Sequence, residues 1–232
     1  MRTVAHPAAN AEELPAVAGL EARSRHGRGR TGLGPARRTF DIVLSTAVLA
    51  VTSPLLVATA VAIKWQMGRP VLFRHQRAGR DGVPFELLKF RSMRPLQPGE
   101  RAPDSDGARI TPLGRILRMT SIDELPSFIN VLRGEMGIVG PRPLPVRYVD
   151  RYTPRQRRRL DVPPGVTGWA QVNGRNRVPW EDRLELDVWY VEHRSLALDL
   201  RILAATIPAV LRRTGIAGTD HATMPELPAR PE

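Results

Sequence analysis

The chain of 232 residues contains no cysteine and only two lysines. Without thiols it has no disulfide, thiol nucleophile, iron–sulfur cluster or thiolate zinc site. The five histidines are scattered without ligand spacing, which argues against a metal site built from histidine. Neither Lys64 nor Lys89 follows a glycine, so the chain has no phosphate-binding loop of the Walker type.

Positive charge is plentiful and is carried almost entirely by arginine. The chain has 35 basic and 23 acidic residues, and residues 41–213 hold 27 and 17 of them. We predict a disordered basic tail over residues 1–36 and a flexible tail over 214–232, because both lack a regular apolar period. The excess charge of the folded part implies an anionic partner: phosphates, a lipid surface or nucleic acid.

A glycine pattern in the first tail resembles a dinucleotide-binding fingerprint. Gly27, Gly29 and Gly32 have the required spacing, but no apolar strand precedes them. Such a fingerprint must follow a buried strand and begin a helix. We therefore interpret this stretch as part of a flexible arm.

One long hydrophobic segment, residues 42–63, contains no charge over 22 positions. It reaches the roughly 20 residues that cross a bilayer core. Ser53 and Pro54 interrupt its centre, and basic residues flank both of its ends, which favours keeping both ends in the cytoplasm. We predict a re-entrant membrane helix hairpin over residues 37–69 that breaks at this pair. A kinked spanning helix and a buried core helix of a soluble protein are the alternatives.

After this segment, residues 71–93 have the pattern of a β-hairpin, and residues 94–108 that of a loop. The period of two in the second strand places Lys89 and Arg91 on one face, about 7 Å apart. Two cations at this separation suit a phosphate group. The alternative is an ordinary solvated strand face.

A pair of neighbouring carboxylates, Asp123 and Glu124, is predicted at the start of a helix. Ser121 and Glu124 have the spacing of a capping box, and Gly134 would end the helix. If Asp123 is the N-cap residue instead, Pro126 lies in the first turn of the helix. There the backbone N–H that proline lacks has no partner within the helix, so its absence costs little free energy. In either register the carboxylates lie where the helix dipole favours negative charge.

The chemistry of this pair follows from its geometry and from a nearby arginine. Neighbouring side chains on a helix diverge by about 100°, so one carboxylate could attack while the other holds a metal. Arg142 is flanked by prolines, which hold the backbone extended and suit a stiff phosphate clamp. The alternatives are acids that only cap a helix and an exposed arginine in a connector.

Five arginines crowd the segment 151–159, which suits lipid headgroups, a substrate diphosphate or a solvated helix face. We predict a helix over 180–193 that carries Asp187, and a last helix over about 198–213 that lies at a membrane interface or packs on the core. The expected fold is α+β and mainly helical. It joins the re-entrant hairpin to a cytoplasm-facing catalytic domain, residues 70–213, with a small β-hairpin and interfacial helices.

Several long motifs resemble the bacterial sugar transferases, the monotopic phosphoglycosyl transferases. The resemblance covers nearly all of 37–213 and contains RRTFDIVLS, the Ser53-Pro54 break, FRHQRAGRDGVPFELLKFRSM, RITPLGRILRMTSIDELPSFINVLRGEMGIVGPRPL, PGVTGWAQVNGRN and LDVWYVEHRSLALDLRIL, in that order. Glu135 stands where the family usually has Asp, and Gly137 where it usually has Ser. Longer members carry additional spanning helices, so this chain resembles the minimal catalytic form.

The resemblance implies transfer of a sugar phosphate from a UDP-sugar to a polyprenyl phosphate with release of UMP. It implies a ping-pong route through a covalent aspartyl-phosphosugar, with Asp123 as nucleophile and Glu124 as ligand of a Mg²⁺ cofactor. Lys89, Arg142 and Asp187 match other functional positions of the family. It also implies a monotopic protein of the inner membrane that initiates exopolysaccharide or glycoconjugate assembly, in contact with membrane lipids.

Two alternative functions, from other functional classes, are a membrane-tethered nucleic-acid-binding protein and a scaffold protein without catalytic activity. Aromatic residues are only 5% of the chain, which leaves no regular stacking platform for bases, so nucleic acid is not an expected partner. The intact pair of Asp123 and Glu124 argues against a pure scaffold. The sequence leaves open which sugar is transferred and whether the chain forms a homo-oligomer.

Overall fold

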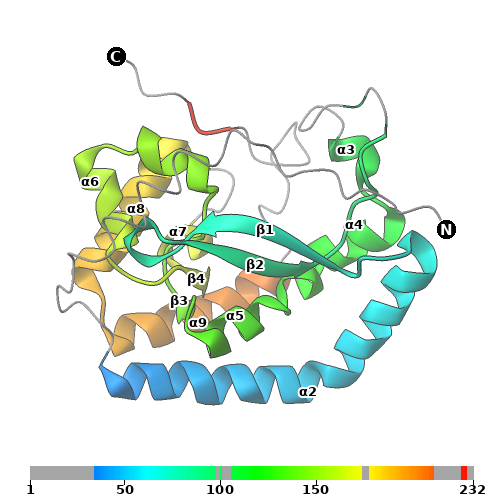
Figure 1. Cartoon of the computed structure of the whole chain (residues 1–232). Helices are drawn as coiled ribbons and strands as arrows, with labels where there is room; N and C mark the ends of the chain where they lie inside the picture. Colours follow the sequence, from blue (N-terminus) through cyan, green and yellow to red (C-terminus); the bar gives the residue numbers. More distant parts are fainter. Residues whose placement is uncertain (1–33, 98–99, 101–105, 174–177, 212–225, 229–232) are drawn as a thin grey trace.

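The computed structural model describes residues 34–97, 100, 106–173, 178–211 and 226–228. The helices are α2 (Pro35–Met67), α3 (Asp106–Arg109), α4 (Pro112–Met119), α5 (Ser127–Arg133), α6 (Pro154–Arg157), α7 (Trp169–Val172), α8 (Trp180–His193) and α9 (Leu196–Leu211). The strands are β1 (Leu72–Ala78), β2 (Pro84–Phe90), β3 (Gly137–Val139) and β4 (Gly165–Thr167). Figure 1 shows the hairpin β1–β2 above α5, with α2 beneath.

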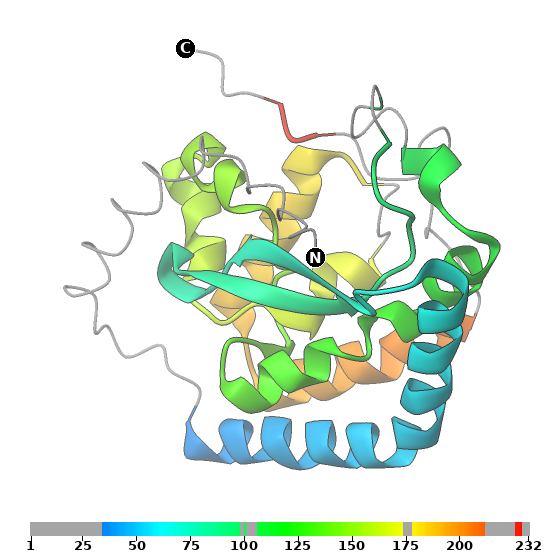
Figure 2. The same ribbon diagram turned by 45° about the vertical axis from the view of Figure 1, so that its right-hand side comes forward.

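The apolar helix α2 bends in its middle but does not break. It remains one helix of 33 residues with Pro54 inside it, and Figure 2 shows its two halves meeting at a steep angle. Pro54 cannot donate to the carbonyl of Ala50, and the Ser53 hydroxyl donates to that carbonyl instead, at 2.8 Å. The predicted break at Ser53 and Pro54 is therefore a kink, because a neighbouring side chain replaces the lost backbone hydrogen bond.

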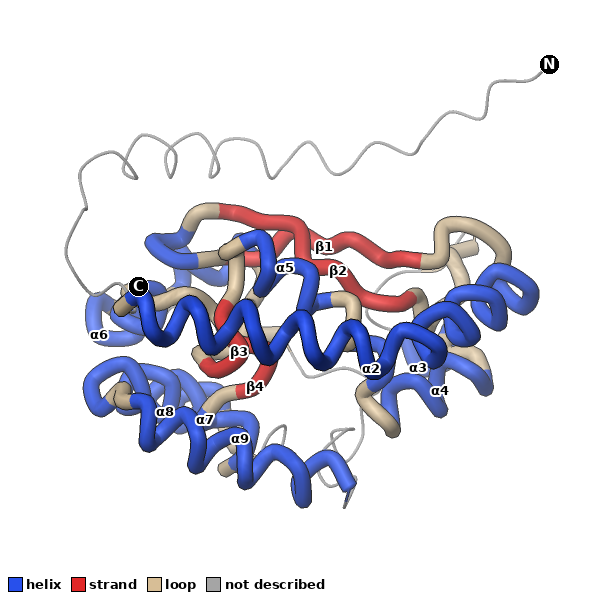
Figure 3. The backbone as a smooth tube through the Cα atoms, turned by 90° about the horizontal axis from the view of Figure 1, so that it is seen from below, coloured by secondary structure: helices blue, strands red, loops and turns tan. Residues whose placement is uncertain are grey.

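Most of α2 is exposed to the surroundings of the molecule. It is the one helix of the described residues long and apolar enough to cross a membrane, and only 11% of its most apolar window is buried. A core helix of a soluble protein would be mostly buried, so α2 is suited to lipid contact. Seen from below in Figure 3, it runs along the underside of the domain. Its most exposed large side chains are Val43, Val51, Val57, Val61 and Trp65.

The N-terminal end of α2 is fixed to the rest of the fold by polar contacts. Arg38 donates to the carbonyls of Val131 and Leu132 at 2.6 and 2.7 Å, which lie in the last turn of α5. Asp41 accepts a hydrogen bond from the backbone of Ile138 at 3.1 Å. The first turns of α2 thus pack within the domain, although the sequence assigned them to the membrane segment.

The hairpin has the predicted position and an unbroken antiparallel register from Leu72–Phe90 to Ala78–Pro84. The free edge of β2 is covered by a side-chain amide. Asn130 of α5 is fully buried; its Oδ1 accepts from Leu88 N at 3.0 Å and its Nδ2 donates to Glu86 O at 2.7 Å. One side chain therefore pairs with the strand as a third strand would, and joins β2 to α5.

A second, parallel pair of strands, β3 and β4, was not predicted from the sequence. Each strand has three residues, too few to show a period of two. The pairing requires close backbone approach: a Cβ on Gly165 would lie 2.1 Å from the Gly140 nitrogen. This small sheet lies between α5 and α9 and leads directly to Arg142.

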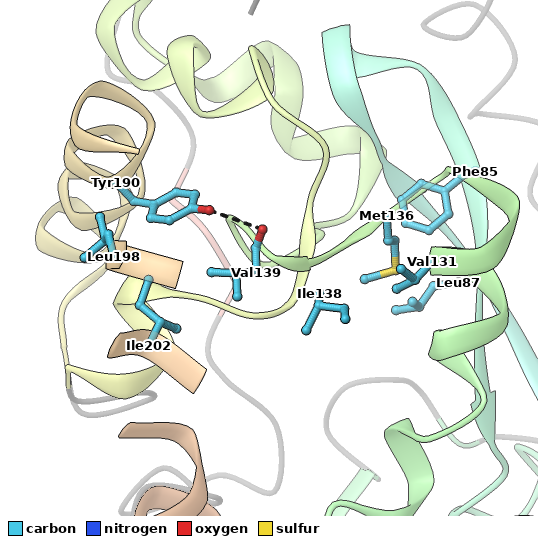
Figure 4. Close-up of a cluster of buried hydrophobic side chains, with 9 residues drawn as sticks. All are labelled: Phe85, Leu87, Val131, Met136, Ile138, Val139, Tyr190, Leu198 and Ile202. Carbon is cyan, nitrogen blue, oxygen red and sulfur yellow. Dashed lines mark hydrogen bonds between the residues drawn. The ribbon is translucent and has the colours of Figure 1, made fainter. Parts of the chain in front are cut away.

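The main hydrophobic cluster joins the hairpin to the last two helices (Figure 4). The hydroxyl oxygen of Tyr190 of α8 lies 3.3 Å from the Val139 carbonyl oxygen, while Ile202 of α9 is fully buried. The last helix therefore packs on the core, and its other side exposes Leu196, Leu200 and Ile207. The members of the cluster are Phe85, Leu87, Val131, Met136, Ile138, Val139, Tyr190, Leu198 and Ile202.

The mainly helical α+β fold predicted from the sequence is confirmed. The helix α8 has the predicted bounds and begins after Pro179, while α9 lies within two residues of its expected position. Within the predicted tail 214–232, residues 226–228 dock on the domain: Leu227 is buried and Glu226 accepts from Arg147 at 3.0 Å. The glycine pattern at 27–32, most of both tails and part of the predicted loop 94–108 lie outside the described residues.

Candidate functional site

Asp123 and Glu124 lie in a single 3-10 turn, Ile122–Glu124, between α4 and α5. The predicted capping box is wrong: Ser121 has left-handed backbone angles and makes no capping hydrogen bond. The cap at Asp123 is also wrong, because Pro126 is the N-cap residue and α5 begins at Ser127. Proline suits the start of a helix because it has no backbone N–H that would need an acceptor. Other side chains, rather than the α5 dipole, therefore set the charge of the two carboxylates.

Glu124 is held by two cations that come from distant parts of the chain. Its Oε1 accepts from Lys89 Nζ at 2.6 Å and from an Arg142 terminal nitrogen at 2.8 Å. Burial opposes ionisation of Glu124, but the charges of Arg142 and Lys89 outweigh burial and lower its pKa. Glu124 is therefore ionised at neutral pH. The structure brings together three residues that the sequence singled out, separated by up to 53 positions in the chain (Lys89 to Arg142).

Asp123, the neighbouring carboxylate, has the opposite environment. Its side chain is buried and accepts no hydrogen bond from the residues that the structure describes. Burial raises its pKa to about 6, against the opposing charge of Lys89. At neutral pH the carboxylate is mostly ionised while being poorly solvated. A poorly solvated, unpaired carboxylate is a better nucleophile than one held by hydrogen bonds.

A buried ion pair supports Arg142 from behind. Asp187 of α8 accepts from Arg159 through one oxygen, Oδ2, at 2.7 and 3.1 Å, and both side chains are 3% exposed or less. Arg159 also donates to the Arg142 carbonyl at 2.7 Å, and to the Tyr152 hydroxyl at 3.1 Å. Asp187 is therefore linked to the Glu124 group by hydrogen bonds through Arg159 and the backbone of Arg142, and its charge also acts directly on the Arg142 guanidinium.

Arg91, which was predicted to share a phosphate with Lys89, is directed elsewhere. It is buried and donates to the carbonyls of Met67, Gly68 and Arg69, at the C-terminal end of α2. These carbonyls have no partner within the helix, so a guanidinium suits them. The structure does not bring Arg91 to the carboxylates; its contacts are those of an anchor for α2.

The arginines of segment 151–159 do not form a free cationic patch in the described structure. Four of them pair with acidic residues: Arg151 with Glu226, Arg155 with Glu185, Arg158 with Glu192 and Arg159 with Asp187. Arg157 lies 3.9 Å from Asp150. The suggestion that this segment binds headgroups or a diphosphate is therefore not supported, because most of its charge is already neutralised on α8.

Sequence reasoning missed two arginines near the site. Arg159 is buried on the far side of Arg142, and its partner Asp187 lies 28 positions away, so no local pattern pairs them. Arg77 of β1 carries a charge that affects Arg142 and Glu124. The alternation applied to β2 would have found it, since the register places Phe73 directly opposite Lys89 and Arg77 on the same face.

The two carboxylates have the chemistry that magnesium requires. The described residues contain no group of three or more histidine and acidic side chains that could hold a metal by themselves. Mg²⁺ is usually held by one or two carboxylates, with waters and substrate phosphates as the other ligands. Asp123 and Glu124, adjacent and next to fixed cations, fit this donor set.

In the comparison with known proteins, the family profile and the similar sequences indicate the same family. The sequence profile described as bacterial sugar transferase matches residues 34–213. An uncharacterised sugar transferase, EpsL of Bacillus subtilis (strain 168), is 45% identical over 81% of this chain and 93% of its own length.

Relatives with named activities are similar over the same region. The UDP-glucose:undecaprenyl-phosphate glucose-1-phosphate transferase of Caulobacter vibrioides is 39% identical over 75% of this chain and 69% of its own. The enzyme of the same name from Escherichia coli K12 is 42% identical over 74% of this chain. This chain spans 39% of that longer protein.

The matched region contains the whole site: the hairpin with Lys89, the turn with both carboxylates, Arg142 and the supporting pair of Arg159 and Asp187. The same region includes α2, whose exposed apolar surface associates the chain with a membrane. The chain is a member of the bacterial sugar transferase family.

Proposed function

We propose that the protein transfers a sugar phosphate from a UDP-sugar to a polyprenyl phosphate of the undecaprenyl type, releasing UMP. The names of its relatives, which are undecaprenyl-phosphate glucose or galactose phosphotransferases, support the reaction class. The observation that carries the mechanism is the contrast between two adjacent carboxylates. Asp123 is buried without a hydrogen-bond partner among the described residues, whereas Glu124 is paired with two cations.

In the first step, an Asp123 oxygen attacks the phosphorus of the phosphate that carries the sugar. A bond from that oxygen to phosphorus forms, and the bond from phosphorus to the oxygen of the nucleoside phosphate breaks. UMP leaves with the electron pair, and the sugar phosphate stays on Asp123. Lys89 and Arg142 lie beside this carboxylate and offset the negative charge that a diphosphate brings toward it.

In the second step, a phosphate oxygen of the polyprenyl phosphate attacks the same phosphorus. The bond to Asp123 breaks and its carboxylate is restored, while the product is a polyprenyl diphosphate sugar. Dividing the transfer in two lets a water-soluble donor and a lipid acceptor use one site in turn. We expect α2 to enter the membrane from the cytoplasmic face and return, which would hold the site where the acceptor phosphate lies.

Glu124, with Asp123 before the attack, would hold a Mg²⁺ ion. The ion would supply charge neutralisation of the diphosphate and orient it for in-line attack. Glu124 keeps its negative charge for this role because Lys89 and Arg142 stabilise the ionised form. Only one Glu124 oxygen carries those hydrogen bonds, so the other is available to a ligand.

Release of UMP from a panel of UDP-sugars tests the proposal. The full-length protein, in nanodiscs with Mg²⁺ and undecaprenyl phosphate, should release UMP from at least one donor. Asp123→Asn should reduce this release by about 10⁴-fold or more, the scale seen when a covalent nucleophile is removed. Intact-protein mass spectrometry without acceptor should detect a sugar-phosphate adduct on the wild type and none on the variant.

Asp150→Asn is the matched control, because Asp150 is an exposed carboxylate whose nearest cation is Arg157 rather than Lys89 or Arg142. It should retain wild-type activity. UMP release that survives Asp123→Asn would disprove the nucleophile assignment, and inactivity of the wild type toward every UDP-sugar would disprove the substrate class.

A further inference from the structure

Arg77 is a partly buried cation without a partner. It lies at the end of β1, and its guanidinium makes no hydrogen bond or ion pair with any residue in the described part of the chain. Its Nε has no exposed surface and no acceptor. Leaving a buried charged group unpaired costs folding free energy. A perturbed cation of this kind next to a site is a candidate for a functional group.

The backbone places Arg77 against the segment that carries Arg142. Arg77 forms an antiparallel bridge with Pro145, and Ala78 N donates to Leu144 O at 2.9 Å. Strand alternation puts Arg77 and His75 on the face of the hairpin that also presents Lys89. This face of β1 therefore continues the catalytic surface beyond Lys89 and Arg142.

The charges on this face are mutually repulsive. Burial, and then the charges of Arg142 and Arg147, lower the pKa of Arg77 to about 10, so it stays charged at neutral pH. Burial, and then Arg77 and Arg147, lower the pKa of His75 to about 4, so its ring is neutral. The ring atom Nδ1 of His75 is buried and also unpartnered. Glu124 offsets part of this positive charge, but it is itself paired with Lys89 and Arg142, so an anion that enters here would still meet the unpaired guanidinium of Arg77.

We propose that Arg77, with His75 beside it, binds the phosphate of the donor that leaves with the nucleoside. The inference rests on the proposed function, in which the donor has two phosphates. One phosphate reacts at Asp123 between Lys89 and Arg142. The other gains negative charge as its bridging bond breaks, and a fixed guanidinium at that position stabilises it more in the transition state than in the ground state.

The acceptor also carries a phosphate, so the experiment separates the two sources. With Arg77→Gln in the full-length protein, we expect kcat to fall and the KM for the UDP-sugar to rise, so that kcat/KM for the donor falls by about 10- to 100-fold, and inhibition by UMP to weaken by a similar factor. The KM for undecaprenyl phosphate should change less than about 2-fold, and Arg77→Lys should recover part of the loss. A rise confined to the acceptor KM would overturn the assignment to the donor.

Arg74→Gln is the matched control. Arg74 lies on the same strand but faces the opposite way, and its side chain is 65% exposed beside Glu86. It should leave both KM values unchanged. Equal effects of Arg74→Gln and Arg77→Gln would indicate a general effect of surface charge and would overturn the proposal.

Thermal unfolding and UMP binding test the inference by measurements that do not require the enzyme to turn over. Because Arg77 is unpaired, Arg77→Gln should leave the melting temperature unchanged or raise it, whereas loss of a structural arginine would lower it. Calorimetric titration with UMP should show tighter binding to the wild type than to Arg77→Gln. Equal UMP affinity would overturn this inference and leave the proposed function standing, whereas absence of UMP release by the wild type would overturn the proposed function, on which the inference rests.

Discussion

The pair of Asp187 and Arg159 lies behind the catalytic surface and is linked to it through Arg142, by a hydrogen bond to its backbone and by the charge of Asp187 on its guanidinium. Its effect on the reaction should therefore depend on Arg142. Removing the charge of Asp187 leaves Arg159 buried without its acid, which costs several kcal/mol if the pair does not rearrange. The carbonyl that Arg159 holds would then be free to move, and with it the guanidinium beside Glu124.

We expect Asp187→Asn to lower kcat by about 10- to 100-fold through misplacement of Arg142. In an Arg142→Ala background the same substitution should have little further effect on kcat. A double-mutant cycle on UMP release measures this coupling, with melting temperatures recorded for each variant. Glu192→Gln, which alters an exposed acid of the same helix, is the control. Additive losses in the cycle would mean that Asp187 does not act through Arg142.

At the level of single residues, the sequence predicted part of the site. Lys89, Glu124 and Arg142 were identified from motifs and the family resemblance, and the structure brings them together. Arg91 was assigned to the same face by strand alternation, but β2 ends at Phe90, so the period of two stops applying there. The roles of Arg159 and Arg77 depend on what lies opposite them in three dimensions, which no local pattern contains.

Among the helices and strands, α2 combines two features: it is long and apolar enough to cross a membrane, and it is kinked in its middle. Pro54 removes one backbone hydrogen bond, and Ser53 satisfies the carbonyl that is left. The bend therefore has a low cost in hydrogen bonding and is built into the sequence. A straight helix of 33 residues would be long enough to pass through the bilayer completely.

We expect Pro54→Ala to straighten α2 and to convert a re-entrant helix into a spanning one. The chain has no cysteine, so single cysteines at Ala36 and Gln66 can report the location of each end. In intact cells a membrane-impermeant maleimide should label neither position in the Pro54 background. In Pro54→Ala it should label one end.

Pro208→Ala in α9 is the control, because it removes a proline from the interior of another helix. It should not change the labelling. Labelling of one end with Pro54 in place would show that α2 spans the membrane despite its kink.

The elements with a strong repeating pattern were predictable and those defined by tertiary contact were not. The hairpin and α8 have clear apolar periods and turn residues at their ends. The start of α5 was misplaced because a Ser-x-x-Glu pattern also fits a turn in which Ser121 has left-handed backbone angles. The strands β3 and β4 are short and glycine-rich, and they exist only because each pairs with the other.

In the whole molecule, Arg37 joins the membrane helix to the last two helices. It is buried, forms an ion pair with Asp199 of α9 and donates to the Tyr190 hydroxyl of α8. Tyr190 in turn donates to Asp199 at 2.7 Å. The partners lie 153 or more positions from Arg37, which is why the sequence assigned residue 37 to the membrane segment rather than to the core.

We expect Arg37→Met to destabilise the protein by about 3–5 kcal/mol, because Asp199 would remain buried without its ion-pair partner. Arg155→Met, at an exposed pair with Glu185, should cost about 1 kcal/mol or less. Thermal unfolding of the protein in detergent would compare the two. Adding Asp199→Asn to Arg37→Met should recover part of the loss, and equal stability of the two single variants would contradict the expected role of the buried pair.

The amide of Asn130 has a consequence for how copies of this protein can meet on a crowded membrane. An exposed edge of a two-stranded sheet can pair with the backbone of another chain. In this protein the Asn130 side chain of α5 occupies that edge of β2 with its own hydrogen bonds. Self-association by sheet extension is therefore blocked along that side of β2. Lateral assembly that leaves the ribbon intact must use another surface.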